Sequence, residues 1–105
     1  MSGSQSNRGT YKVEVEEEAW AGLSSLPTSA QEKVTALWRD HLQHTPTQRI
    51  PGKVKELRGE YKGFYQYDIS RDARMIWRVD EHTRTVYVEY IGKHPEWEKR
   101  RKRPF

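Results

Sequence analysis

Two segments with strand-like alternation carry the side chains best suited to chemistry. Gln66 and Asp68 share one face of the first segment, and Arg74 and Arg78 share one face of the second. If the segments pair as neighbouring strands, a carboxylate, an amide and two guanidinium groups lie on one side of a sheet. Arginine grips phosphate through parallel hydrogen bonds, so this face is a candidate anion-binding surface. The alternative is a solvated face on which acidic and basic side chains pair across strands.

His94 is the candidate for proton transfer. It follows the last strand-like segment in the run Gly92-Lys93-His94, and Gly92 is expected to free the backbone to turn there. An imidazole titrates near neutral pH and can act as a general acid or base beside the polar face. The alternative is an ordinary exposed loop histidine.

The other three histidines carry weaker signals. His41 lies on the apolar face of a helical pattern and is expected to be a hydrogen-bonded residue of the core or its boundary, whereas His44 ends that helix and His82 falls in a hairpin loop. Two histidines without a companion ligand indicate a metal only weakly, so no metal or other cofactor is expected. The chain has no cysteine, which excludes disulfides and cysteine nucleophiles.

The positive charge of the chain is concentrated near its end. The net charge is +4 at pH 7, but residues 99–103 (Lys-Arg-Arg-Lys-Arg) contribute +5 and the remainder sums to −1. A basic cluster beside a near-neutral body is typical of a segment that binds a polyanion, most often nucleic acid. The alternative is a solvated tail. The mean hydropathy is −1.09 and no apolar run is long enough to cross a membrane, so we expect a cytoplasmic protein.

The elements that would position these groups follow from periodicity and from helix breakers. Residues 1–10 read as a flexible polar leader, residues 11–98 as one domain and residues 99–105 as a basic tail. The domain begins with a strand at 11–15, and two amphipathic helices separated by Pro27 follow it.

The second helix is predicted to open at Thr28 and Ser29, with Ser29 and Glu32 forming a capping box. Residues 45–56 contain prolines and a glycine and are predicted to be an irregular loop. Three strands joined by short connections, and therefore antiparallel, follow at 64–69, 73–79 and 85–91.

The sequence thus predicts an α+β fold in which an αα-hairpin packs on a small, mainly antiparallel sheet, in the order β-α-α-β-β-β. A short basic C-terminal helix or tail is expected to end the chain. One sheet face is expected to meet the helices, while the polar face meets water or a ligand. The predicted core residues are Trp20, Val34, Leu37, Trp38, Tyr67, Trp77 and Val79.

Four stretches, taken in order and spacing, resemble the RelE/ParE superfamily, the toxins of bacterial type II toxin–antitoxin modules. These are Lys-Glu-Leu-Arg-Gly at 55–59, Tyr-Lys-Gly-Phe at 61–64, Arg-Met-Ile-Trp-Arg-Val-Asp at 74–80 and Val-Tyr-Val-Glu-Tyr-Ile-Gly-Lys-His at 86–94. The resemblance covers roughly residues 11–98, and the family fold has the element order predicted above.

The resemblance implies an activity. RelE-like and YafQ-like members are endoribonucleases that cut mRNA, usually in the ribosomal A site, whereas ParE members inhibit DNA gyrase. Arg74 matches the phosphate-contacting arginine of the family, and His94 matches the position at which YafQ-like members have a catalytic histidine. Asp72 matches an aspartate before the third strand, and Trp97 lies near the final family aromatic.

The chain also departs from the family. Gln66 and Asp68 stand where RelE-like members have lysines, and YafQ-like members have a histidine at the position of Asp68. Two interpretations stay open: Asp68 replaces that histidine as a general base, or it marks a weakened enzyme.

The roles implied are those of a metal-independent cut in which the 2′-OH of RNA attacks the adjacent phosphorus. Asp68 would accept the proton, His94 would protonate the leaving oxygen and Arg74 would stabilise the charged phosphorane. The expected RNA-binding residues are Arg71, Arg78, Lys93 and Trp97.

The expected partners are mRNA on the ribosome and a cognate antitoxin. The alternatives are a ParE-like gyrase inhibitor without catalysis and a degenerate family member that only binds protein.

Overall fold

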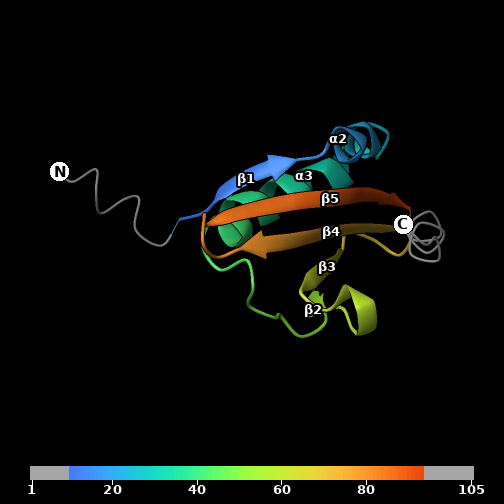
Figure 1. Ribbon diagram of the computed structural model, residues 1–105. Coiled ribbons are helices and arrows are strands. Elements are labelled where there is room, and N and C mark those ends of the chain that lie inside the picture. The colour runs from blue at the N-terminus through green and yellow to red at the C-terminus, as the bar shows by residue number, and fades with distance from the viewer. Residues whose placement is uncertain (1–9, 94–105) are drawn as a thin grey trace.

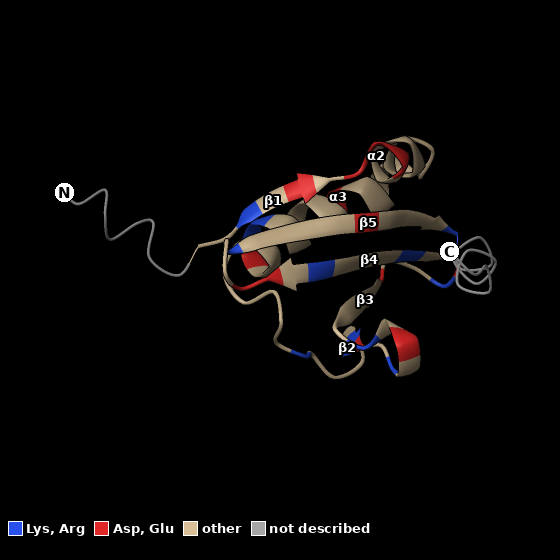
Figure 2. Ribbon diagram, in the orientation of Figure 1, with Lys and Arg blue, Asp and Glu red and all other residues tan. Residues whose placement is uncertain are grey.

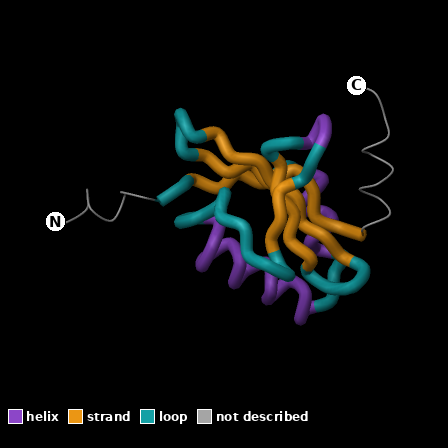
Figure 3. The backbone as a smooth tube through the Cα atoms, turned by 90° about the horizontal axis from the view of Figure 1, so that it is seen from below, coloured by secondary structure: helices purple, strands orange, loops and turns teal. Residues whose placement is uncertain are grey.

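The computed structural model describes residues 10–93, which form two helices packed on a mixed sheet. The elements in chain order are β1 (Lys12–Val15), α2 (Glu17–Ser24), α3 (Thr28–Leu37), a π-helical turn (Trp38–Leu42), β2 (Val54–Glu56), a 3-10 turn (Gly59–Tyr61), β3 (Phe64–Asp68), β4 (Ala73–Asp80) and β5 (Thr85–Lys93). Both helices lie against the same face of the sheet (Figures 1 and 3). The predicted fold class is therefore confirmed.

The five-stranded sheet has the order β1-β5-β4-β3-β2. β1 runs parallel to β5, and the other neighbours are antiparallel. β4 and β5 occupy the middle, and β1 and β2 form the two edges. The residues of the polar face therefore lie on β3 and β4, each of which has a hydrogen-bonded neighbouring strand on both sides.

The main core lies between the helices and one sheet face. Fully buried apolar side chains of β4 and β5 meet those of α3, and Trp77 at its centre donates a hydrogen bond from Nε1 to the carbonyl of Pro46 at 2.9 Å. Val34, Leu37 and Trp77 are buried as predicted, and Tyr67, Val79 and Trp38 pack against the core while partly exposed.

Trp20 is the exception among the predicted core residues, because 48% of it is exposed. It lies on the outer side of α2, with its ring centroid 5.9 Å from that of Trp38. Ala19 is the residue of α2 that enters the core instead. The helical spacing of Trp20 and Leu23 indicated an apolar face, but α2 packs on β5 through the side of Ala19 and Gly22, which leaves Trp20 on its outer side.

Two local predictions are wrong. Residues Val54–Glu56 form strand β2 within the stretch predicted to be an irregular loop, and Ile50 bridges Val54 beside it. The strand has only three residues, and the adjacent Pro51 and Gly52 obscure its alternation. The capping box is absent as well, since α3 begins at Thr28 with Pro27 as its N-cap and no side-chain cap.

A β-bulge shapes the polar face. Ile76 pairs with Tyr90 and Trp77 pairs with Val88, so Glu89 is the extra residue of β5. A bulge shifts the side chains that follow it relative to the partner strand. This one brings the Glu89 carboxylate beside Arg78, whose Nε lies 2.8 Å from Oε2.

The polar face also holds a small apolar cluster, contrary to the expectation that this face meets water or a ligand. Its buried members are Leu57, Tyr61, Ile76 and Tyr90, with Phe64 packed against them. The Tyr61 and Phe64 rings meet edge to face at 5.5 Å between centroids. The turn after β2 therefore covers part of this face, and the charged groups surround the covered part.

Within residues 10–93, none of the helices has the length and apolar character needed to cross a membrane.

Candidate functional site

An ion pair joins β3 and β4 on the polar face. Asp68 and Arg74 are cross-strand partners, and Nε of Arg74 lies 3.0 Å from Oδ1 of Asp68 without the alignment of a hydrogen bond. Gln66 donates from Nε2 to the same carboxylate oxygen at 3.0 Å. The structure thus brings together three of the four polar residues predicted for this face.

Arg74 is held by backbone as well as by charge. Its Nη1 donates to the carbonyls of Ser70 at 2.7 Å, Arg71 at 3.2 Å and Ala73 at 3.1 Å. Its side chain is only 16% exposed. The guanidinium therefore closes the β3–β4 turn and presents a fixed positive charge beside Asp68.

Arg78 lies farther along β4 and is balanced by its neighbours. It pairs with Glu89, and its guanidinium carbon lies 4.3 Å from the centre of the Tyr87 ring. The side chain remains 43% exposed. Arg78 is thus a partly neutralised cation on the same strand as Arg74.

Two further predicted residues gather at the Arg74 end of the sheet. Arg71 is exposed in the β3–β4 turn, and Lys93 is exposed at the end of β5, opposite Ala73. Figure 2 shows these cations where β4 begins and β5 ends. Asp72 is exposed in the same turn. His94 and Trp97 lie outside the described residues, and Lys93 is the last residue before them.

Gly92 serves a different purpose from the predicted one. It continues β5 and is not among the described glycines with positive φ. A Cβ on Gly92 would lie 2.8 Å from the hydroxyl of Tyr90, which donates to the Lys93 carbonyl at 2.5 Å. Gly92 therefore makes room for the Tyr90 ring to cross the strand.

His41 is a core residue, as predicted. It is 5% exposed, its Nδ1 lies 3.2 Å from the Thr45 hydroxyl, and its ring meets Trp77 edge to face. Burial lowers the pKa of His41, against a smaller opposing effect of the Gln48 backbone. His41 is consequently neutral at physiological pH. Among residues 10–93, no three histidine or acidic side chains are grouped to hold a metal ion.

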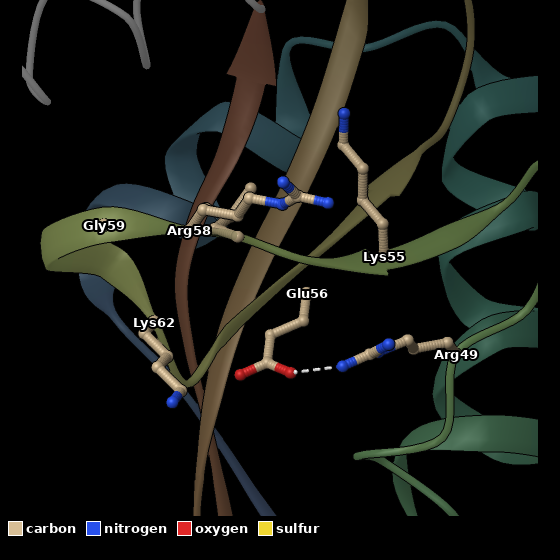
Figure 4. A pocket seen from close by; sticks show the side chains of 7 residues that line it. Arg49, Lys55, Glu56, Arg58, Gly59 and Lys62 are labelled. Atoms are coloured by element: carbon tan, nitrogen blue, oxygen red, sulfur yellow. Dashed lines mark hydrogen bonds and ion pairs between the residues drawn. The ribbon is translucent and has the colours of Figure 1, made fainter.

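The sequence reasoning missed a cleft of about 520 Å³ beside β2 and the turn that follows it. We call it the basic cleft and define it by its charged lining residues, which are Arg49, Lys55, Glu56, Arg58 and Lys62. In Figure 4, Lys55 and Arg58 lie on one side of β2, and Glu56 lies on the other side with Arg49 and Lys62. Most of these residues belong to motifs quoted above, but only folding of the 45–53 loop adds Arg49.

Glu56 organises this cleft. Its Oε1 accepts from Arg49 at 3.0 Å and its Oε2 accepts from the backbone N–H of Gly63 at 3.1 Å. The hydrogen bond from Arg49 is the main cause of the lowered pKa of Glu56, with a smaller contribution from Gly63. The carboxylate therefore stays charged and joins the 45–53 loop to the β2–β3 connection.

Comparison with solved structures identifies the architecture. A YoeB/ParE toxin from Agrobacterium tumefaciens is 22% identical with a TM-score of 0.68, over 79% of this chain and 98% of that one. A chain of an archaeal RelE–RelB complex from Pyrococcus horikoshii is 24% identical with a TM-score of 0.66, over 80% of this chain and 94% of that one. A chain of the RelBE2 toxin–antitoxin complex from Mycobacterium tuberculosis is 22% identical with a TM-score of 0.64, over 81% and 99%.

Protein-family models and curated protein sequences yield no match to the chain. The likeness lies in the arrangement of helices and strands, which the described residues share with these toxins over nearly the whole of their length. The chain therefore has the fold of the RelE/ParE-type toxins.

Proposed function

We propose that this protein is the toxin of a type II toxin–antitoxin module and that it cleaves mRNA on the ribosome. The observation that carries the proposal is the Asp68–Arg74 pair, at the end of the sheet where β5 leads to Lys93 and His94. Similar folds occur in toxins of the RelE and YoeB types. The proposal places the protein in the cytoplasm, together with its target.

The proposed cut needs no metal ion. The 2′-oxygen of one nucleotide forms a bond to the adjacent phosphorus, and the bond from phosphorus to the 5′-oxygen of the next nucleotide breaks. Asp68 accepts the proton of the 2′-OH, and His94 gives a proton to the departing 5′-oxygen. The products are a 2′,3′-cyclic phosphate and a 5′-OH. This reaction requires one group that accepts a proton and a second group that donates one.

Arg74 is suited to stabilise the phosphorane, because a fixed cation acts without reorganising during the reaction. Its Nη1 is used by the turn, so the phosphate would be met by the remaining edge of the guanidinium. Arg71, Arg78 and Lys93 would hold flanking phosphates, and Trp97 would stack on a base. Together these residues would place one phosphodiester across the start of β4.

The proposed resting partner is an antitoxin. Solved relatives of this fold include toxin–antitoxin complexes such as RelBE2 and YoeB–YefM. The exposed cations where β4 begins and β5 ends, together with the outer edge of β2, would accept an acidic helix or an added strand.

A second candidate function is ParE-like inhibition of DNA gyrase. One observation favours it: Arg74 is mostly buried and already donates to three carbonyls. An arginine used in this way stabilises the turn without any need for catalysis, and a binding module would keep it. A degenerate member that only binds protein would keep it too.

One induction experiment separates these functions. The chain is expressed from a tight promoter, mRNA 5′ ends are mapped within minutes, and plasmid supercoiling is measured in the same cells. New 5′-OH ends within codons, with unchanged supercoiling, are the expected result. Loss of supercoiling without new mRNA 5′ ends would indicate that the protein inhibits gyrase. If neither effect is observed, protein binding is the function that remains.

A further inference from the structure

A tyrosine of β5 holds the backbone at the end of the same strand. The Tyr90 hydroxyl donates to the carbonyl oxygen of Lys93 at 2.5 Å, at the short end of the range for such bonds. To reach this oxygen, the ring runs along the strand and over Gly92, where a Cβ would lie 2.8 Å from the hydroxyl and 3.0 Å from Cζ. Residues two apart in a strand project from the same face, so the path is open only because residue 92 is a glycine.

The Tyr90 ring is fixed by its neighbours. It is 8% exposed, and Ile76 lies directly opposite it on β4. The ring belongs to the apolar cluster that also contains Leu57 and Tyr61. Because packing restricts the side chain to this orientation, the hydroxyl is a preorganised donor for the Lys93 carbonyl.

This hydrogen bond lies beside the Asp68–Arg74 pair. Gly92 is the cross-strand partner of Arg74, at a spacing of about 5 Å between the strands. Cross-strand partners project to the same side of a sheet, so the Tyr90 ring lies on the face that carries Arg74. The residue that holds the end of β5 is therefore also next to the proposed site.

The Lys93 carbonyl belongs to the peptide bond that joins Lys93 to His94. A peptide unit is planar from the Cα of one residue to the Cα of the next. A hydrogen bond that fixes this carbonyl oxygen therefore also fixes the direction in which the chain continues to His94. Within residues 10–93, Ala73–Lys93 is the last pair of the β4–β5 ladder. The Tyr90 hydroxyl thus acts on the peptide unit that follows this last pair.

We propose that Tyr90 is a positioning residue, whose hydrogen bond to the Lys93 carbonyl directs the backbone so that His94 can transfer a proton beside Arg74. The inference rests on the proposed ribonuclease function for the role of His94. Tyr90 takes no part in the chemistry itself, because its hydroxyl proton is donated to Lys93. A reacting group displaced by about 1 Å loses about 10²-fold in rate, so loss of this bond is expected to lower turnover.

The test removes the hydroxyl and keeps the ring. Tyr90→Phe is compared with Tyr65→Phe, which removes a hydroxyl from a tyrosine of the main core that is 9% exposed. Both substitutions are made in the wild-type chain and in the His94→Ala chain, and thermal unfolding confirms that each variant is folded. Single-turnover cleavage of mRNA on ribosomes gives the rate at saturating protein and the protein concentration at half that rate.

Tyr90→Phe should lower the saturating rate by about tenfold to a hundredfold relative to Tyr65→Phe, with the half-saturating concentration nearly unchanged. In the His94→Ala chain it should have almost no further effect, because the group that it positions is absent. A Tyr90→Phe protein that cuts as fast as Tyr65→Phe would overturn the inference. Equal losses in the two chains would also overturn it, because Tyr90 would then act independently of His94.

Nuclear magnetic resonance relaxation supplies a measurement that does not need cleavage. The amide N–H of His94 belongs to the same peptide unit as the Lys93 carbonyl, so its order parameter should fall in Tyr90→Phe but not in Tyr65→Phe. Gly92→Ala, whose Cβ would displace the hydroxyl, should lower it as well. If wild type never cuts RNA, the ribonuclease proposal fails, but a lower order parameter still supports the positioning by Tyr90. An unchanged order parameter in both variants would overturn the inference.

Discussion

Arg74 combines structural contacts with a charge in the candidate site. The same guanidinium closes the β3–β4 turn through three carbonyls and lies beside Asp68. A substitution at this residue therefore changes stability and any phosphate chemistry together. The proposed mechanism gives His94 a proton-transfer role alone, so it offers the cleaner test of catalysis.

His94→Ala is expected to lower single-turnover RNA cleavage by about 10²–10⁴-fold, because a positioned acid or base contributes that much. Folding and RNA affinity should change little. Arg74→Ala should lower RNA affinity, cleavage and thermal stability together. Of these two variants, only Arg74→Ala should reduce the salt dependence of RNA binding. Cleavage assays, anisotropy and circular dichroism measure these effects. A folded His94→Ala protein that cuts at the wild-type rate would remove His94 from the mechanism.

The buried His41 is expected to make stability depend on pH. Its pKa in the folded state is lowered by burial, so the unfolded chain binds the proton more readily. The contribution is fully present above the unfolded pKa of about 6.5 and declines as the pH falls below it. Urea unfolding at pH 7.5 and 5.5 should therefore show a larger loss for wild type than for His41→Gln. Equal losses would show that His41 is not the titrating group.

At the scale of elements, α2 and β5 meet backbone to backbone at Gly22. A Cβ on Gly22 would lie 1.7 Å from the carbonyl oxygen of Ile91 and 2.9 Å from its carbonyl carbon. Neither atom can move away without shifting a central strand of the sheet. The glycine thus determines how closely the first helix approaches the last strand.

Gly22→Ala is expected to destabilise the protein by about 1–3 kcal/mol, because overpacking forces the backbones apart. Helix propensity alone would favour alanine by about 1 kcal/mol. A loss of unfolding free energy would therefore indicate the close contact, whereas a gain would indicate that helix propensity dominates. Ser24→Ala, on the exposed side of α2, is the matched control and should change stability by less than about 0.5 kcal/mol. Urea unfolding of both variants measures the difference. A stabilised Gly22→Ala protein would contradict the close contact.

At the scale of the whole molecule, charge and architecture point to a partner. The exposed cations of the basic cleft lie beside the edge strand β2, and Arg71 and Lys93 lie where β4 begins and β5 ends. The outer edge of β2 is an open edge of the sheet. An acidic segment or an added strand would cover both features.

Expression of the chain alone should arrest growth, and co-expression with a small protein encoded beside it should restore growth and yield a complex that co-purifies. The physical reason is neutralisation of the exposed cations by the acidic partner. Colony counts and affinity purification measure the two effects. Harmless expression at a high level, together with the absence of any co-purifying neighbour, would refute the antitoxin prediction.

The amino-acid sequence by itself determined the elements with a regular period. The alternation at 64–69 and 73–79 predicted β3 and β4, and it correctly placed Asp68 and Arg74 on one face. Helical spacing likewise predicted α3 and the burial of His41. These features depend on residues close together in the chain, so periodicity is enough to reveal them.

Only the tertiary structure decided the features that join distant segments. The edge strand β2 exists because β3 pairs with it, and Glu56 completes the basic cleft by binding Arg49 from the preceding loop. Trp20 is exposed because α2 turns the side of Ala19 and Gly22 toward β5, although the spacing of Trp20 indicated burial. Such contacts leave no period in the sequence, since each depends on how two separately formed elements meet.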